Sequence, residues 1–300
     1  MAVGGQTQLV YLPATLAREL GFYRDEDLDV TIQDFAGGAK SLEALLGGSA
    51  DVVCGFYDHT IQMAAQGREL RAFVSMMRSP GFVAVGGPGV SRIEDLKGKT
   101  VGVSAPGSST HMFLNYLLST HGLSTGDVST PSIGMSATAV GAITHGKVDA
   151  AIMTDPALEI ARRQEPQLRI LADIRTAEGL KAVFGADAYP SSVLYSTGHW
   201  LAAHPDGARR LARAINRTLD WMRTHPPEEI RQRMPQEFRT DDAQADLEAL
   251  RSSQAMLSPD GKMTQESASI VRKVLSVSLE NVRSASIDLD KTYTNDFLGR

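Results

Sequence analysis

The sequence predicts an α/β protein of two similar lobes, each a mixed, mostly parallel sheet flanked by helices, with a helical C-terminal tail. The main observation is one pattern that occurs twice at a constant offset, in Gly38–Val53 and in Ser136–Met153. The matching residues are Ala44 and Ala142, Gly48 and Gly146, and Asp51 and Asp149. Each copy is typical of a short helix, a glycine stop and a buried strand. Because 300 residues with 42% hydrophobic content can bury a large core, the duplication indicates two lobes with a cleft between them.

The first elements alternate between strand and helix. Leu9–Leu12 is predicted as a short apolar strand, and Pro13 then lies in the first turn of a helix that ends at Gly21. Alternating apolar and polar residues in Leu28–Phe35 predict a half-buried strand. The glycine pair Gly37-Gly38 is expected to open the next helix.

The following segment continues this alternation. Asp51–Phe56 is a continuous apolar run of the kind found in parallel strands. A helix from His59 to Gln66 with Gly67 as its C-cap should follow, and then the strand Arg71–Met77. This strand–helix–strand order with short connections indicates a parallel sheet covered on both faces.

A second unit begins after the turn signal Pro80-Gly81. Its predicted elements are the strand Phe82–Val85, the helical turn Ile93–Leu96, the strand Thr100–Ser104, the helix Thr110–His121, and the strands Val128–Ile133, Ala150–Met153 and Leu168–Ala172. The segment Asp187–Ser192 is predicted to return the chain to the first unit. We therefore expect residues 1–79 plus 193–300 to form one lobe and residues 80–192 the other, with two crossing strands as the hinge.

The C-terminal part is predicted to be helical. His199–Thr224, Ala243–Met256 and Thr264–Ser278 are amphipathic stretches separated by proline-containing breaks. We expect these helices to pack on the outside of the first lobe and to help hold the two lobes together.

Composition excludes several classes of protein. A formal net charge of -5 and the lack of a basic run argue against nucleic acid as a partner. Cys54 is the only cysteine, so neither an internal disulfide nor a cysteine-based metal site is expected. The seven histidines lack metal-binding spacing, and the dinucleotide-binding and nucleophile-elbow glycine motifs are missing. We therefore expect no cofactor and no catalytic residues.

Four segments together resemble a known family: YLPATLARELGFYRDEDLDVTIQDFAGG, GGSADVVCG, DLKGKTVGVSAPGSS and GKVDAAIMTDP. They are similar to the nitrate/sulfonate/taurine group of solute-binding proteins, the SsuA-like and NMT1-like receptors of ABC importers, over about Leu9 to Tyr195. The resemblance implies a type II periplasmic-binding-protein fold and hinged closure around one small-molecule ligand. It also implies a single chain that delivers its ligand to an ABC permease in the inner membrane.

Two donor-rich helix starts, one in each lobe, are the leading candidates for ligand binding. A helix N-terminus offers backbone N–H groups and partial positive charge to an anion. The candidate residues are Gly38, Ala39 and Lys40 in the first lobe, and Ser108, Ser109, Thr110 and His111 in the second. Plain N-capping by the hydroxyls, and a solvated Lys40, are the alternatives.

Six further residues are candidate contacts. They are Tyr11, Tyr57, His59, Arg78, Asp155 and Tyr189, which the predicted elements place at strand ends or crossings. The tyrosines could stack on a ligand or cap the core, and Arg78 could pair with an anion or with a surface carboxylate. His59 could instead be a polar residue at a helix start. Asp155 most simply caps a helix and, if it reaches the ligand, accepts from a donor group.

These features predict a periplasmic receptor for a small organic anion, with an aromatic carboxylate or sulfonate favoured over nitrate. The start Met1–Gln6 does not read as a signal peptide, so the expectation is a removed export signal, with the cytosol as the alternative. A neutral pyrimidine-like heterocycle remains an alternative ligand. An enzyme on the same scaffold and the effector domain of a regulator are alternative functions, although relatives that make the thiamine pyrimidine are marked by a cysteine-rich iron site.

Overall fold

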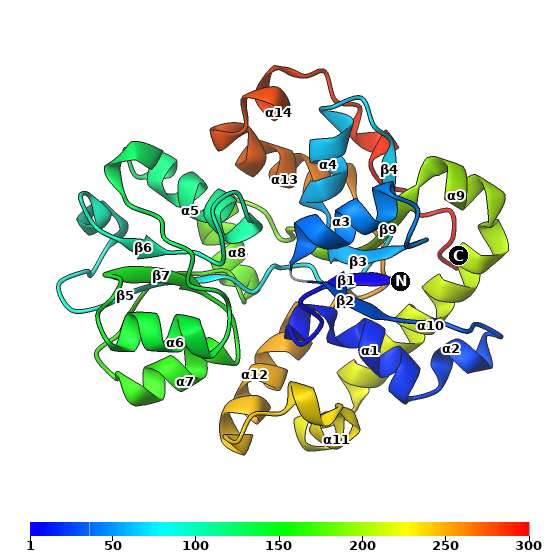
Figure 1. Cartoon of the computed structure of the whole chain (residues 1–300), viewed down its shortest axis with the longest axis horizontal. Helices are drawn as coiled ribbons and strands as arrows, with labels where there is room; N and C mark the ends of the chain where they lie inside the picture. The colour runs from blue at the N-terminus through cyan, green and yellow to red at the C-terminus, as the bar shows by residue number, and fades with distance from the viewer. Residues whose placement is uncertain (36, 300) are drawn as a thin grey trace.

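The computed structural model describes residues 1–35 and 37–299 and divides their strands between two sheets (Figure 1). The first sheet contains β1 (Ala2–Gly4), β2 (Gln33–Phe35), β3 (Val53–Phe56), β4 (Leu70–Ser75) and β9 (Ser192–Thr197). The second contains β5 (Val83–Gly86), β6 (Val101–Gly102), β7 (Ala150–Met153) and β8 (Arg169–Asp173). Each sheet with its helices forms one side of the molecule, which confirms the predicted two-lobed α/β fold.

Strand direction follows one rule in both sheets. The orders are β2-β1-β3-β9-β4 and β6-β7-β5-β8. In the first sheet only β9 runs against the others, and in the second only β5 does. β5 and β9 are the first strands that follow each passage between the sheets, so each lobe is a mixed, mostly parallel sheet as predicted.

Helices cover both sheets. The α-helices are α1 (Leu12–Glu19), α2 (Phe22–Asp25), α3 (Gly38–Leu46), α4 (Asp58–Ala64), α5 (Ser109–Thr120), α6 (Ala137–Thr144), α7 (Ala157–Gln164), α8 (Ala177–Phe184), α9 (Gly198–Ala203), α10 (Pro205–Thr224), α11 (Pro227–Arg233), α12 (Ala243–Met256), α13 (Gln265–Ser278) and α14 (Glu280–Ser284). Short 3-10 helices lie at Leu9–Tyr11, Ile93–Leu96, Thr125–Asp127, Gln236–Phe238 and Leu289–Lys291. Of the helices that the structure describes, none is both long and apolar enough to cross a bilayer.

The sequence duplication is confirmed as a structural repeat. α3 leads to β3 in the first lobe and α6 leads to β7 in the second. The glycine stops Gly48 and Gly146 have φ of 75° and 63°, in the left-handed region that favours glycine. The backbone N–H groups of Ser49 and Lys147 each donate to the carbonyl of the matching alanine at 2.9 Å. The two copies therefore end their helices with the same hydrogen bonds.

Two predicted strands were wrong. Leu9–Leu12 forms a 3-10 helix and the first residue of α1, because Pro13 sits at the start of α1 with a φ suited to a helix. The first strand is instead Ala2–Gly4, which pairs with β2 and β3. Val128–Ile133 makes only isolated bridges beside β6, since Pro131 has no N–H to donate.

The two passages between the sheets are hydrogen-bonded to each other. The Tyr189 N–H donates to the Arg78 carbonyl at 2.7 Å, and the Ser191 N–H donates to the Met77 carbonyl at 3.1 Å. The Ser191 hydroxyl also donates to the Ser79 carbonyl at 2.7 Å. These bonds join the chain leaving the first sheet to the chain returning to it. The predicted lobe boundaries at 79/80 and 192/193 stay a prediction.

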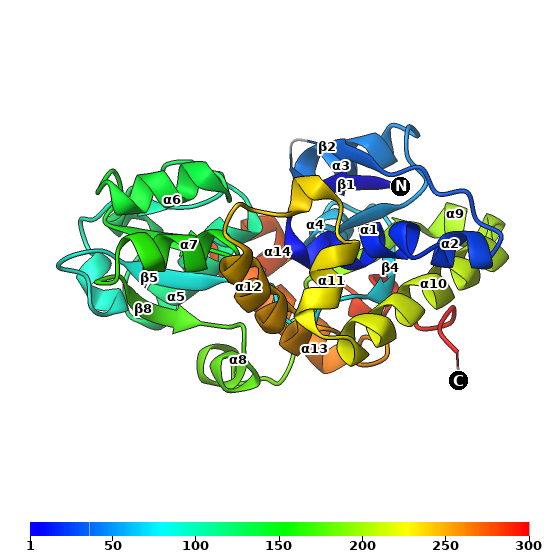
Figure 2. The same cartoon turned by 90° about the horizontal axis from the view of Figure 1, so that it is seen from below.

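The C-terminal helices touch both sides of the molecule (Figure 2). α13 packs against α4 of the first lobe and against α5 of the second. α12 packs against the Leu9–Tyr11 turn and against α7. α10 covers α1 and α2. The helical tail therefore lies on the first lobe and also bridges to the second.

The repeat predicts a position-specific effect of glycine substitution. Gly48→Ala and Gly146→Ala should each lower the free energy of unfolding by about 1–2 kcal/mol, because alanine is strained at positive φ. No atom lies within 4 Å of an added Cβ at either site, so backbone strain alone should act.

Gly141→Ala is the matched control within α6. An added Cβ there lies 3.8 Å from the nearest atom, an ordinary contact, and the φ is not left-handed. This change should raise stability by about 0.5–1 kcal/mol, since glycine disfavours a helix interior. Chemical denaturation measures all three variants, and equal stability of Gly141→Ala and Gly146→Ala would contradict the assignment of the repeat.

Candidate functional site

A cavity of about 460 Å³ lies between the two lobes. Its walls come from the ends of β1 and β3 and from the starts of α3, α4 and α5, together with the loop before α6. The carboxyl ends of parallel strands and the helix starts that follow them share one edge of each sheet. Both lobes therefore present the edge at which this fold class binds ligands.

The start of α3 is built from glycine. Gly37 has a φ of 102° and Gly38 begins the helix. A Cβ at Gly4 would lie 2.4 Å from the backbone nitrogen of Gly38, so the end of β1 touches the helix start. A Cβ at Gly38 would lie 2.7 Å from the ring of His59. Glycine at these positions lets β1, α3 and α4 meet at the cavity, where Gly38 and Ala39 begin α3. The N–H group of the next residue, Lys40, already donates to the Gly37 carbonyl at 3.1 Å.

The start of α5 carries a cluster of hydroxyl groups. The hydroxyl oxygens of Ser104, Ser108 and Thr110 lie 2.8 Å from one another, and the Ser104 N–H donates to Thr110 at 3.0 Å. Ser108 is the N-cap and accepts from the His111 N–H at 3.4 Å. The capping hydroxyl of Ser108 thus also belongs to the hydrogen-bonded group that it forms with Ser104 and Thr110 beside the cavity.

The loop before α6 supplies a third part of the wall, through Gly134 and Met135. Among the residues that the structure describes, no side chain caps α6. At the repeat offset, Met135 corresponds to Gly37 and Ser136 to Gly38. The duplication therefore predicts this wall as well, although the glycine and hydroxyl motifs indicated only two helix starts.

Aromatic rings form the apolar side of the cavity. Phe56 of the first lobe stacks on Phe82 of the second, with centroids 5.8 Å apart and planes 6° from parallel. Tyr11 meets Phe56 edge-on at 6.1 Å. Burial raises the pKa of Tyr11 well above its ordinary value, so its hydroxyl stays protonated. This side can pack against a ring or an alkyl group of a ligand.

A polar group closes the cavity at the start of α4. Asp58 is 3% exposed, and its Oδ2 accepts from the Ser109 hydroxyl at 2.5 Å, across the two lobes. His59 Nδ1 and the Tyr195 hydroxyl lie 2.9 Å apart. Asp58 is the one acidic side chain among the residues that line the cavity, and that lining includes no lysine or arginine.

The structure brings seven predicted residues together around this cavity: Tyr11, Gly38, Ala39, His59, Ser108, Ser109 and Thr110. The lining also contains Gln8, Phe56, Asp58, Gln62, Phe82 and Ser104, which the sequence analysis did not select. Phe56 ends a predicted strand and Asp58 follows that strand, so the sequence could have indicated both positions. The positions of Gln8 and Phe82 in the lining could not be predicted, because they depend on how the two lobes face each other.

Six predicted contacts lie outside the lining of the cavity. The exposed Lys40 pairs with Glu43 at 2.7 Å on the surface of α3, which is a correction to its proposed charge on the ligand. His111 Nδ1 accepts from the Gly107 N–H at 2.9 Å, and burial lowers the pKa of His111. A neutral, internally bonded His111 gives an anion no positive charge.

Three others are structural. Tyr57 is fully buried, and its hydroxyl lies 2.5 Å from the Thr292 hydroxyl. Tyr189 is buried against Phe184, with centroids 5.0 Å apart. Arg78 donates to the Ala255 carbonyl at 3.2 Å. Each side chain therefore holds the core or the crossing rather than facing the cavity.

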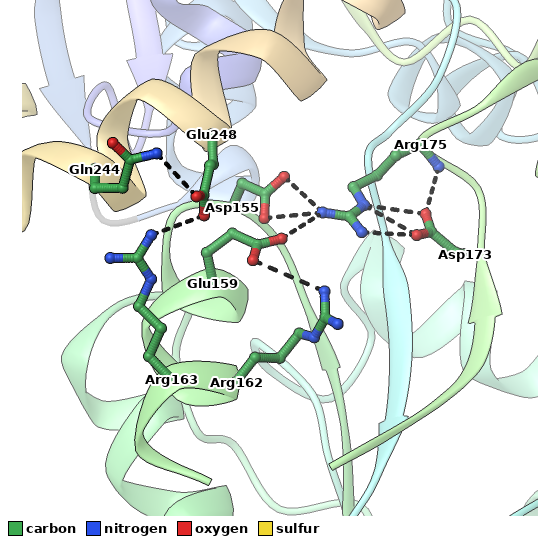
Figure 3. A network of polar contacts seen from close by, with 8 residues as sticks. All are labelled: Asp155, Glu159, Arg162, Arg163, Asp173, Arg175, Gln244 and Glu248. Carbon is green, nitrogen blue, oxygen red and sulfur yellow. Dashed lines mark hydrogen bonds and ion pairs between the residues drawn. The ribbon is translucent and has the colours of Figure 1, made fainter. Parts of the chain in front are cut away.

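Asp155 belongs to a charged network in the second lobe (Figure 3). Arg175 lies 3.0 Å from carboxylate oxygens of both Asp155 and Glu159, and 2.7 Å from Asp173. Arg163 of α7 reaches Glu248 of α12 at 2.8 Å (Figure 3), and thus joins the second lobe to the helical tail. Asp155 is therefore an ion-pair partner and lies outside the lining of the cavity.

The chain is matched by a family described as NMT1/THI5 like, over residues 8–229. This confirms the resemblance seen in the sequence. Among relatives by sequence is the 4-amino-5-hydroxymethyl-2-methylpyrimidine phosphate synthase of Candida albicans, 24% identical over 73% of this chain. The match spans 65% of that enzyme's own length.

Solved structures support the fold. A protein from Bordetella bronchiseptica RB50 is 38% identical and has a TM-score of 0.91, with 99% of this chain and 94% of that protein covered. The alkanesulfonate-binding protein SsuA from Xanthomonas axonopodis pv. citri, solved with MOPS bound, is 18% identical with a TM-score of 0.73, over 98% of this chain and 97% of SsuA. At that identity the likeness to SsuA shows the fold alone.

Asp155 gives a test of the charged network through pH. Burial raises the pKa of Asp155 to about 6, above its ordinary value of 3.8, against the opposing effect of Arg175. Between about pH 4 and pH 6, the Asp155 carboxyl therefore stays protonated in the folded protein and is ionised in the unfolded chain. The stabilisation is complete below about pH 4 and is lost as the pH rises through 6, by up to about 3 kcal/mol.

Asp155→Asn cannot titrate and should lack this pH dependence. The free energy of unfolding of each protein is measured with denaturant at pH 4, 5, 6 and 7. The value for wild type minus the value for the variant should fall as the pH rises and should level off near pH 7. The exposed Asp187→Asn is the control and should differ from wild type by a constant amount. A difference that grows with pH would contradict the buried, protonated Asp155.

Proposed function

Since the chain belongs to the NMT1/THI5-like family, we propose that it is the solute-binding protein of an ABC importer and captures a small organic anion between its lobes. The observation that carries this proposal is the convergence of helix starts from both lobes on one cavity of about 460 Å³. That volume lies within the range usual for small-molecule sites. The ligand would be released unaltered to a membrane permease.

The donors for an anion come from backbone and hydroxyl groups. The first two residues of α3, Gly38 and Ala39, and the hydroxyl-bearing residues at the α5 start line the cavity, and no lysine or arginine belongs to its lining. Helix N-termini can bind anions without a full cationic charge. This arrangement suits a single carboxylate or sulfonate group.

The aromatic side favours an aromatic carboxylate or sulfonate. Tyr11, Phe56 and Phe82 offer ring faces and edges to an apolar part of the ligand. SsuA, which shares the fold, was solved with the sulfonate MOPS. A micromolar affinity requires about 8 kcal/mol, which several charge-assisted hydrogen bonds and the burial of a ring can supply.

Hinged closure would complete the site. The contact between Ser109 and Asp58, and the ion pairs of Arg163 with Asp242 and Glu248, join the lobes in the present arrangement. Rotation about the hydrogen-bonded crossings would break these contacts and open the cavity. A ligand that touches both lobes would favour the closed form. We propose further that the protein acts as a single chain outside the cytoplasm.

A neutral pyrimidine-like ligand is the second candidate, and a specific observation favours it. The relative from Candida albicans is named as a synthase of a pyrimidine phosphate. An enzyme on this scaffold would turn over its bound compound, whereas a receptor would release it unchanged. Mass spectrometry of the compound before and after incubation distinguishes the two.

Binding in this cavity should stabilise the protein. In a thermal-shift panel of aromatic carboxylates and sulfonates, at least one anion should raise the melting temperature of wild type. A ligand at about 100 times its Kd adds about 2.7 kcal/mol to the stability of the folded state. Failure of the whole panel at millimolar concentration would contradict the proposal.

Ala39→Trp tests whether the stabilising anion occupies the cavity. Ala39 is exposed and lines the cavity, so a tryptophan should fill it and abolish the stabilisation without changing the core. Ala202→Trp, at an exposed helix position away from the lining, is the matched control and should respond like wild type. An equal response of both variants would place binding elsewhere.

A further inference from the structure

Asp58 carries a hydrogen-bonding requirement that the rest of the protein does not meet. Its Oδ2 accepts from Ser109 at 2.5 Å. Its Oδ1 is buried and has no hydrogen-bond partner within the described chain. The nearest ring nitrogen, His59 Nε2, is 3.9 Å from Oδ1 and too far for a hydrogen bond. A buried carboxylate oxygen without a donor is costly, and native proteins seldom keep one without a reason.

Helix capping does not account for this carboxylate. Asp58 is the first residue of α4, but the described side chains make no cap hydrogen bond at that end. An ion pair with lysine or arginine does not account for it either. Among the described residues, the basic side chain within 4 Å of Asp58 is His59. Asp58 also belongs to the lining of the cavity, so a ligand held there is the remaining source of a donor.

The charge on Asp58 also constrains the proposed ligand. A simple anion held at the helix starts would face a carboxylate across the same cavity, and like charges at close range repel. A ligand that carries an N–H donor at its other end removes both difficulties. The donor satisfies Oδ1, and a cationic donor also balances the charge.

We propose that Asp58 selects bifunctional solutes, which carry an amino-type N–H donor for Asp58 Oδ1 and an anionic or acceptor group for the helix starts of α3 and α5. This inference rests on the proposed receptor function and narrows its ligand class. The Ser109 contact on Oδ2 holds the carboxylate in place from the opposite lobe, so closure and donor recognition meet at one side chain.

Matched pairs of probes test this inference, because the members of a pair differ only in the amino group. The pairs are taurine with ethanesulfonate, 4-(aminomethyl)benzoate with 4-methylbenzoate, and 4-aminopyrimidine-5-methanol with pyrimidine-5-methanol. Affinities for wild type are measured by calorimetry or thermal shift. In at least one pair the amino member should bind about tenfold tighter or more, equivalent to about 1.4 kcal/mol.

Asp58→Asn should reduce that preference to about twofold or less, because an amide gives no charge-assisted bond to the amino group. Asp51→Asn, at an exposed position before β3, is the control and should keep the preference. Since the comparison within wild type needs no variant, it stands even if Asp58→Asn fails to fold.

The outcomes separate the two proposals. If the amino-free anions bind wild type as tightly as their partners, the receptor proposal stands and the selection by an N–H donor is wrong. If wild type shows the preference and a folded Asp58→Asn variant keeps it, the role of Asp58 is wrong. Binding of none of the probes would contradict both proposals.

Discussion

The arrangement of the whole molecule depends on the two chain crossings being bonded to each other. Hydrogen bonds from Tyr189 and Ser191 to Arg78, Met77 and Ser79 fix where the second sheet lies relative to the first. Because β5 and β9 follow these crossings and run against their sheets, the helix starts of the two lobes face one another. Without this constraint, α3 and α5 would be two separate helix starts rather than two walls of one cavity.

The chemistry of the cavity is set by neutral groups and one charge. Two helix starts with N–H and hydroxyl groups form part of the lining, aromatic rings form its apolar side, and Asp58 is its one carboxylate. Donors favour an acceptor or anion, whereas Asp58 favours a donor. These demands agree only for a ligand with different groups at its two ends. The ion pair of Arg163 with Glu248 and the packing of α13 on α5 support this arrangement from outside the cavity.

Local sequence patterns predicted much of the fold, since helix ends, glycine stops and buried runs act over a few residues. The repeat at Gly48 and Gly146 is the clearest case. The site was predicted less completely. Asp155 and His111 carry suitable groups, but their partners Arg175 and Gly107 became visible only in three dimensions. Phe82 faces the cavity because of the way the crossings orient the two lobes, and no local pattern encodes that orientation. The first strand was misplaced because an apolar run such as Leu9–Leu12 suits a buried helix equally well.

The central claim is that the two helix starts close on one solute. Lys40 and Thr138 are exposed and occupy equivalent positions of the repeat, at the starts of α3 and α6, and Cys54 is buried away from labels. Spin labels at Lys40→Cys and Thr138→Cys would report the distance between the lobes. The account predicts that a bound anion shortens and narrows the distance distribution. A distribution that does not change on saturation with that anion would contradict it.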